Sequence, residues 1–218
     1  MDLAQKQIIE CIKSAINGKK LKIDKEQVID WENIISLSKN HKVEGLVYSV
    51  IPNEIKESIP NELLNLWKKE VFISGLTQQR HMSEMENVLM EFNKANIDVL
   101  VLKGLVIRDL YTSPTLRTMS DGDLVVKKLD LEKSKEILSS IGYTEYKQTP
   151  NDFMFIKSGC LPIELHWDLA DDHFFKKITL FEEDMWPNIK PINIGESNAK
   201  QMSLEDLAIF QCIHMANI

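Results

Sequence analysis

The stretch S-D-G-D-L-V-V at residues 120–126 places two carboxylates one residue apart at the start of an apolar run. Because side chains alternate between the two faces of a strand, the pattern predicts that Asp121 and Asp123 point the same way, with the apolar residues after them in a core. Two like charges on one strand edge repel each other, and a bound divalent cation would remove that cost. The pair therefore indicates a metal site, with a solvated strand start as the alternative interpretation.

Segments with the pattern of buried strands stand on either side of this pair in the sequence. Residues 97–102 form an apolar run that ends in a Lys103-Gly104 turn, and residues 163–167 read I-E-L-H-W, in which Glu164 alternates with apolar residues. Magnesium prefers hard oxygen ligands, and a pair of such ions clamps the attacking and leaving oxygens in phosphoryl transfer. Three acidic residues on neighbouring strands beside a glycine turn therefore indicate metal-dependent phosphoryl or nucleotidyl transfer.

The composition is that of a globular protein. The 218 residues are 44% hydrophobic and 27% charged, and the formal net charge of -7 disfavours a general nucleic-acid binder, which would neutralise phosphates with basic side chains. No apolar run is long enough to predict a membrane span, and residues 1–6 lack the pattern of a signal peptide. The cysteines lie far apart in no C-x-x-C spacing, so we expect reduced thiols in a cytoplasmic protein, with neither a disulfide framework nor a zinc site.

The chain divides into a helical front end, a mixed core and a final helix. We expect an N-terminal helical region over residues 1–95, an α/β core over residues 96–200 and the start of a C-terminal helix over residues 201–218. That last helix shows no stop signal, so we expect a longer natural chain or a missing C-terminal lobe. The expected helices span residues 3–16, 24–37 (with Asp24 as the cap), 43–50, 60–92, 104–111, 130–141, 181–186 and 203–218. The expected strands span residues 97–102, 121–126, 143–147, 153–157, 162–169 and, with a weaker pattern, 192–194.

Short motifs follow one another in an informative order. L-K-G at residues 102–104 precedes a short helix that ends at Tyr111, Arg117 stands four residues before D-G-D-L-V-V, and G-Y at residues 142–143 precedes I-E-L-H-W. Over about residues 25–218, this order resembles the uncharacterised nucleotidyltransferase family of the polymerase-β-like superfamily. The resemblance implies an α+β fold, with a mixed sheet that carries helices on one face and a helical region before it.

The resemblance also implies roles for particular residues. It places metal binding and catalysis on Asp121 and Asp123, and the third acidic role on Glu164. It implies contact with the phosphates of a nucleoside triphosphate at Lys103 and Gly104, and Mg²⁺ or Mn²⁺ as the cofactor. The superfamily usually has Gly-Ser or Gly-Gly at this turn, where a Lys ammonium would act as a point charge instead. It also usually has an apolar residue between its aspartates, where this chain has a glycine.

Neighbouring polar residues admit more than one interpretation. Arg117 holds a phosphate or orients Asp121, or else it is a surface residue paired with Asp109 or a neighbour. We expect His166 to support the metal ligands from beside them, with a hydrogen-bonded structural role as the alternative. Asp168 and residues 171–173 predict a solvated turn after the strand.

The function predicted from these patterns is metal-dependent transfer of a nucleoside monophosphate from a nucleoside triphosphate to an unknown hydroxyl acceptor. The acidic net charge favours a small molecule or a protein over a nucleic acid as the acceptor. The alternative is a catalytically inactive member of the fold that serves as a binding or interaction module, which the departures at Lys103 and Gly122 favour. A phosphodiesterase or phosphatase is a weaker alternative, because such sites usually recruit several His and Asp ligands from different loops. The nucleotide base and the oligomeric state carry no signal in the sequence.

Overall fold

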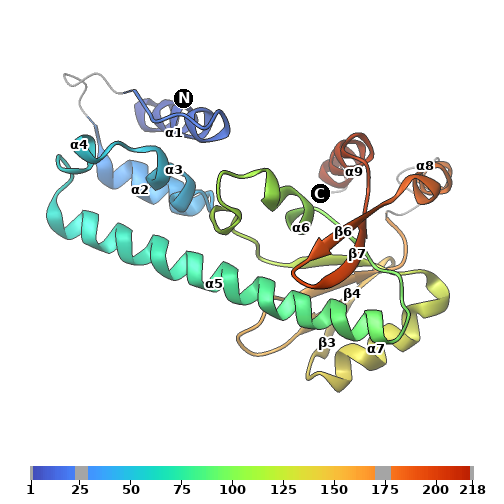
Figure 1. Cartoon of the computed structure of the whole chain (residues 1–218). Helices are drawn as coiled ribbons and strands as arrows, with labels where there is room; N and C mark the ends of the chain where they lie inside the picture. The colour runs from blue at the N-terminus through green and yellow to red at the C-terminus, as the bar shows by residue number, and fades with distance from the viewer. Residues whose placement is uncertain (1, 23–28, 170–177, 217–218) are drawn as a thin grey trace. The chain divides into compact units, whose positions relative to one another are not determined.

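A computed structural model of the chain describes residues 2–22, 29–169 and 178–216 (Figure 1). By mutual packing the chain forms two units, Met1–Gln79 with Arg108–Thr118, and Arg80–Ile107 with Met119–Ile218. Helix α5, Asn61–Lys94, contributes residues to both units. The domain boundary predicted near residue 95 stays a prediction. The predicted cap Asp24 and the predicted turn at residues 171–173 lie outside the described residues.

The first unit is helical, and local capping explains where its helices begin. The Asp2 carboxylate accepts a hydrogen bond from Gln5 N at 2.8 Å, and the Gln5 side chain accepts one from Asp2 N at 3.0 Å. The second helix begins at Trp31, later than predicted, because the Asp30 carboxylate caps it by accepting from Asn33 N at 3.1 Å. The elements of this unit, besides α5, are α1 Leu3–Ile16, α2 Trp31–Asn40, α3 Glu44–Val50, α4 Asn53–Lys56 and the 3-10 turns Arg108–Leu110 and Pro114–Leu116.

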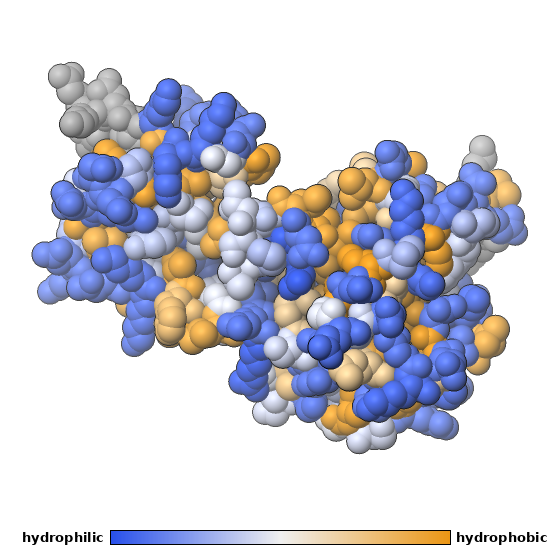
Figure 2. All heavy atoms as spheres, in the orientation of Figure 1, coloured by the Kyte–Doolittle hydropathy of each residue, from blue (hydrophilic) through white to orange (hydrophobic). Residues whose placement is uncertain are grey.

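Aromatic side chains form the centre of the first unit. The Trp67 ring is fully buried, and its centroid lies 5.1 Å from that of Tyr48 and 6.5 Å from that of Trp31. Tilted and edge-to-face rings at these separations combine a large buried apolar area with favourable ring electrostatics. On the opposite side of α5, Phe72 and Leu76 are exposed, and Figure 2 shows hydrophobic spheres over this part of the helix.

The second unit is built on a mixed sheet of seven strands in the order β3-β4-β5-β2-β1-β7-β6. The central strand β2 pairs with β5 in parallel and with β1 in antiparallel orientation, and β1 pairs with β7 in parallel. All four residues of β2 are buried, as expected for a central strand covered on its faces. The strands are β1 Leu100–Val101, β2 Gly122–Val125, β3 Thr144–Gln148, β4 Asp152–Ile156, β5 Ile163–His166, β6 Lys190–Ile194 and β7 Ser197–Gln201.

Helices of the second unit pack against this sheet. Met85 of α5 packs against Gly122 of β2, where a Cβ would collide with the Met85 side chain, so the glycine between the two aspartates makes room for the helix. The predicted helix over residues 104–111 is shorter, because a 3-10 turn follows α6. The remaining elements are α6 Gly104–Ile107, α7 Leu131–Ser140, α8 Ile178–Met185, α9 Leu204–Ala216 and the 3-10 turns Lys128–Asp130 and Trp186–Asn188.

The structure adds one strand that the sequence did not predict. β7 reads S-N-A-K-Q, which has little of the apolar and β-branched character that indicates a strand. Its position depends on α5, because Asn93 Nδ2 donates to Asn198 O at 2.8 Å and Asn198 N donates to Asn93 Oδ1 at 2.8 Å. The α+β class, with a mixed sheet and an N-terminal helical region, is confirmed. Within the described ranges, every helix lacks the combination of length and apolar character that a membrane crossing requires.

Candidate metal centre

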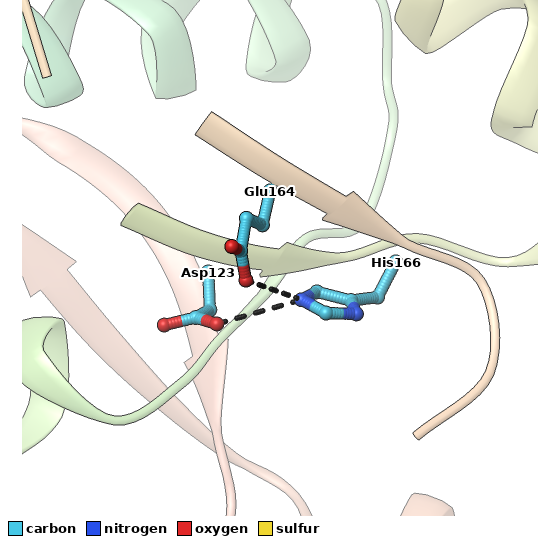
Figure 3. Close-up of side chains that lie close together, drawn as sticks. All are labelled: Asp123, Glu164 and His166. Carbon is cyan, nitrogen blue, oxygen red and sulfur yellow. Dashed lines mark ion pairs between the residues drawn. The ribbon is translucent and has the colours of Figure 1, made fainter. Parts of the chain in front are cut away.

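Three side chains that could bind a metal meet where β2 runs beside β5. The parallel register places Asp123 opposite Glu164 and Val125 opposite His166. Residues two apart on a strand share a face, so Glu164 and His166 lie on the same face as Asp123. Figure 3 shows the three side chains pointing toward one another from the two strands. The pairing of these strands therefore assembles the cluster.

The distances within the cluster suit a shared ion. His166 Nε2 lies 3.4 Å from Asp123 Oδ1 and 3.6 Å from Glu164 Oε2. One ligand atom from each of the three residues lies within 4.8 Å of the others. A small divalent metal with ligands at about 2.1 Å brings its ligand atoms to about 3–4 Å from one another. The spacing of the three side chains therefore fits a metal ion.

The imidazole of His166 supplies a second observation in favour of a metal. Among the described residues, its buried Nε2 atom makes no close hydrogen bond and is held between two carboxylates at ion-pair distance. Buried polar atoms are nearly always hydrogen-bonded, and an exception calls for an explanation such as a bound ion. Once it has lost its proton, an imidazole nitrogen aimed between two carboxylates can serve as a metal ligand. The donor set therefore fits a divalent metal.

Lys103 adds a cation to the same cluster. Its Nζ atom lies 2.5 Å from Asp123 Oδ1, and the side chains of Lys103 and Asp123 are 16% and 2% exposed. A backbone hydrogen bond next to this ion pair, from Leu102 N to Asp123 O at 3.1 Å, holds the two chain segments side by side. The burial of Asp123 shows that the alternative of a solvated strand start is wrong for this residue.

The charges in the cluster stabilise one another. Burial raises the pKa of Asp123, but the His166 imidazole and the Lys103 ammonium outweigh burial and hold that pKa below its usual range. Burial lowers the pKa of His166, but the carboxylates of Asp123 and Glu164 outweigh it and raise this pKa to about 9. At neutral pH without a metal, the cluster therefore combines two carboxylates with a protonated imidazole and an ammonium group.

Other residues singled out in the sequence lie outside this cluster. Asp121 stands one residue before β2 and is not among the three residues that converge, so its role stays a prediction. Gly104 begins α6, where a Cβ would lie 2.9 Å from Met119 Cγ, which explains a glycine at this position. Its predicted contact with phosphate also stays a prediction.

Arg117 belongs to the first unit, and its predicted contact with nucleotide stays a prediction. Its Nη1 atom donates to Thr118 O at 2.6 Å. Asp109, which the sequence offered as a partner for Arg117, instead has Arg108 Nε at 3.2 Å from its Oδ1. The local contacts of Arg117 are thus different from the predicted surface pair with Asp109.

His214 of α9 is a neighbour of the cluster that the sequence did not indicate. Burial is the main reason that its pKa is lowered. The charges of Lys103 and His166 lower this pKa further, and those of Asp123 and Glu164 oppose the change. Its ring packs at 6.0 Å from the Phe210 ring, one helical turn earlier. A histidine in a largely apolar helix carries no sequence signal for such a position, because only the packing of α9 brings it there.

A family model and several solved structures are similar to the chain. A sequence profile of a family described as uncharacterised nucleotidyltransferase matches residues 27–217. No curated protein sequence matches the chain. The structure is similar to that of the antibiotic-resistance factor ANT(2'')-Ia, at 10% identity and a TM-score of 0.47, over 65% of this chain and 75% of that chain.

Further solved structures are similar at the same low level of identity. The lincosamide antibiotic adenylyltransferase LnuA, bound to lincomycin, matches at 15% identity and a TM-score of 0.42, over 59% of this chain and 84% of that chain. An antigenic nucleotidyltransferase-like protein from Paracoccidioides brasiliensis matches at 17% identity and a TM-score of 0.40, over 59% of this chain and 63% of that chain.

Proposed function

The chain belongs to the uncharacterised nucleotidyltransferase family, and from this premise we propose that it transfers a nucleoside monophosphate from a nucleoside triphosphate to a hydroxyl group in a metal-dependent reaction. Membership confirms the family predicted from the motif order and supports nucleotidyl transfer as the coarse activity. Beyond this coarse activity, we propose the metal, the residues that hold it and the class of acceptor.

The observation that carries the proposal is the convergence of Asp123, Glu164 and His166 on neighbouring parallel strands. Burial of the Asp123 carboxylate and of the His166 imidazole costs desolvation free energy, which nearby opposite charges or a bound cation must offset. Both features are useful at a site that binds a cation. The cluster is also held by strands, which position ligands more precisely than loops do.

The chain's own residues would hold the metal and the nucleotide. Asp123 and Glu164 offer carboxylate oxygens, and His166 offers Nε2 once that nitrogen has lost its proton. Mg²⁺ or Mn²⁺ bound there would neutralise charge on the phosphates. The acceptor oxygen would bond to the α-phosphorus as the bond to pyrophosphate breaks, so pyrophosphate would leave and the hydroxyl proton would pass to water. We propose Asp121 as a further ligand, since it stands next to β2, and Lys103 and Gly104 as the residues that contact the nucleotide.

The acceptor is proposed to be a small molecule or a protein. A nucleic-acid acceptor would need basic side chains to neutralise its phosphates, whereas the chain has a formal net charge of -7.

A catalytically inactive binding module is the second candidate, and one observation favours it. The Lys103 ammonium group forms an ion pair with the Asp123 oxygen that would otherwise be available to bind a metal. A member of the fold that no longer used a metal would be expected to neutralise its buried aspartate in this way.

The test is a transfer assay with each nucleoside triphosphate labelled at the α-phosphate, together with Mg²⁺ or Mn²⁺ and an extract that contains small molecules and proteins. We expect label in a product that is distinct from the nucleotide, and no product from Asp123→Asn. The matched control is Glu84→Gln, which removes a carboxylate that pairs with Lys157 at 2.6 Å elsewhere in the same unit. A wild-type protein that binds nucleotide and labels no acceptor in a broad screen would establish the binding module instead.

A further inference from the structure

We infer that Lys103 is a built-in cation that competes with the metal for Asp123, so that the site accepts a metal only when Lys103 moves away. This inference rests on the proposed function for the identity of the metal site. Two observations support the inference: the backbone of Lys103 is left-handed, and its ammonium group contacts the buried carboxylate of Asp123.

The backbone at Lys103 has a conformation that is uncommon for a residue with a side chain. Lys103 has φ +44°, a left-handed conformation that is costly for any residue with a side chain. Among the described residues, Lys42 and Asn96 also have positive φ, and both follow the end of a helix, where a left-handed residue completes the cap. Lys103 follows the strand β1 instead. Its conformation therefore needs another explanation, and the contact of its side chain with Asp123 supplies one.

The ion pair of Lys103 and Asp123 is largely buried. Asp123 is 2% exposed and Lys103 is 16% exposed, with Nζ 2.5 Å from Oδ1. A buried carboxylate without a counter-ion is strongly unfavourable, so Lys103 stabilises the protein when no metal is bound. The same oxygen lies 3.4 Å from His166 Nε2. One carboxylate oxygen thus serves both the ammonium group and the candidate metal position.

The Lys103 ammonium group and a metal ion would compete for Asp123 because both are positively charged. A divalent ion bound to Asp123 repels an ammonium group held on the same carboxylate, and the ion satisfies the carboxylate better. Lys103 would therefore leave Asp123 when the metal binds. The displaced ammonium needs a new anion, and the phosphates of a nucleotide at the adjacent Lys103-Gly104 turn are of the required charge. Metal and nucleotide would then enter together, and the metal-free protein would keep its buried aspartate neutralised.

The experiment is a titration of the full chain with Mn²⁺ alone at neutral pH, with free Mn²⁺ measured by electron paramagnetic resonance. The apparent metal affinity is reduced by the fraction of molecules in which Lys103 occupies the site, so we expect Lys103→Met to bind Mn²⁺ about tenfold more tightly than the wild type. Lys103→Arg keeps a cation and should bind no more tightly than the wild type. The matched control is Lys157→Met, which removes a partly buried lysine paired with Glu84 in the same unit.

A second measurement uses the wild-type protein, so the inference does not depend on how well Lys103→Met folds. An amine-reactive reagent is applied with and without Mg²⁺, and modification of each lysine is measured by mass spectrometry. We expect Mg²⁺ to increase the modification of Lys103 severalfold and to leave that of Lys157 unchanged. Lower or unchanged modification of Lys103 in saturating Mg²⁺ would overturn the inference.

The outcomes separate this inference from the proposed function. Tighter Mn²⁺ binding by Lys103→Met alone supports the competition, even if the wild-type protein transfers no nucleotide. Equal affinity in wild type and Lys103→Met, or equal tightening by Lys157→Met, overturns the competition and leaves the proposed transferase intact. No Mn²⁺ binding by any of the proteins, with or without a nucleoside triphosphate present, would overturn both.

Discussion

The two units use the same kind of ion pair for different purposes. In the helical unit, Lys39 Nζ lies 2.7 Å from Glu70 Oε1, with side chains that are 44% and 29% exposed. In the sheet unit, Lys103 lies 2.5 Å from Asp123, with side chains that are 16% and 2% exposed. Water screens the first pair, so its distance says little about stability. The second pair is buried, and either charge alone would be costly there.

The same contrast holds for what lies at the centre of each unit. The helical unit buries aromatic rings around Trp67, and the hydrophobic effect makes that burial favourable without any ligand. The sheet unit buries charges beside its apolar core, and such charges are stable only while they neutralise one another. The first unit is therefore stabilised by apolar burial, whereas the buried charges of the second unit depend on one another.

The largest expected effect comes from the apolar centre of the helical unit. Trp67→Ala should lower the free energy of unfolding by about 4 kcal/mol, because it removes a fully buried ring and leaves a cavity. Mn²⁺ should not restore that loss. Urea denaturation with and without Mn²⁺ measures both quantities. A loss that Mn²⁺ repairs would break the division of roles between the two units.

The next effect comes from the buried charge of the sheet unit. Asp123→Asn should lower the free energy of unfolding of the metal-free protein by about 3 kcal/mol, because Lys103 and His166 lose the anion between them. It should also abolish stabilisation by Mn²⁺, which acts by binding the native state. Denaturation of the variant in metal-free buffer and in Mn²⁺ tests both effects. A neutral or stabilising substitution would show that repulsion between carboxylates dominates instead.

A smaller effect is expected from pH. The pKa of His166 is raised from 6.5 to about 9 in the folded protein, so its stabilising charge is fully present below pH 6.5 and is lost as the pH rises through about 9. The metal-free wild type should therefore lose about 3 kcal/mol of stability over this range relative to His166→Asn. Thermal melting at several pH values, without metal, measures the difference. Parallel curves for the two proteins would contradict the charge assigned to His166.

The smallest effect is expected from the exposed pair in the helical unit. Glu70→Gln should change the free energy of unfolding by about 0.5 kcal/mol, because solvent already screens its contact with Lys39. Added salt should reduce that difference further. Urea denaturation at low and high ionic strength provides the measurement. A loss as large as that of Asp123→Asn would show that exposure does not distinguish the two pairs.

The local elements were the most predictable part of the fold. The periodic apolar residues of α1 and the stop at residues 17–18 predict a helix over residues 3–16, which is where the structure has it. β2 and β5 lie within their predicted ranges, because the alternation of apolar and polar residues that predicts a strand is a property of consecutive residues. β7 was missed, because its polar sequence depends on Asn93 of α5 for its position.

The candidate site was predicted in part. The sequence indicated Asp123 and Glu164 by their place on alternating strands, and the structure brings these two together. Asp121, which the same pattern paired with Asp123, lies before the strand begins and outside the three-residue cluster. The sequence also assigned His166 a supporting position, whereas its Nε2 lies between both carboxylates. Spacing along one strand predicts a shared face, but it does not predict where pairing starts.

By itself the sequence determined the helices, the main strands, the family and the acidic residues, because caps, periodicity and motif order act between residues that are close in the chain. Only the tertiary structure decided that Asp123 is buried, that Glu164 and His166 stand opposite β2, and that Lys103 lies on the aspartate. These features depend on the register of strands that lie far apart in the sequence and on a left-handed turn at a lysine. Burial and pairing between distant residues arise from packing, and local residue pattern does not specify them.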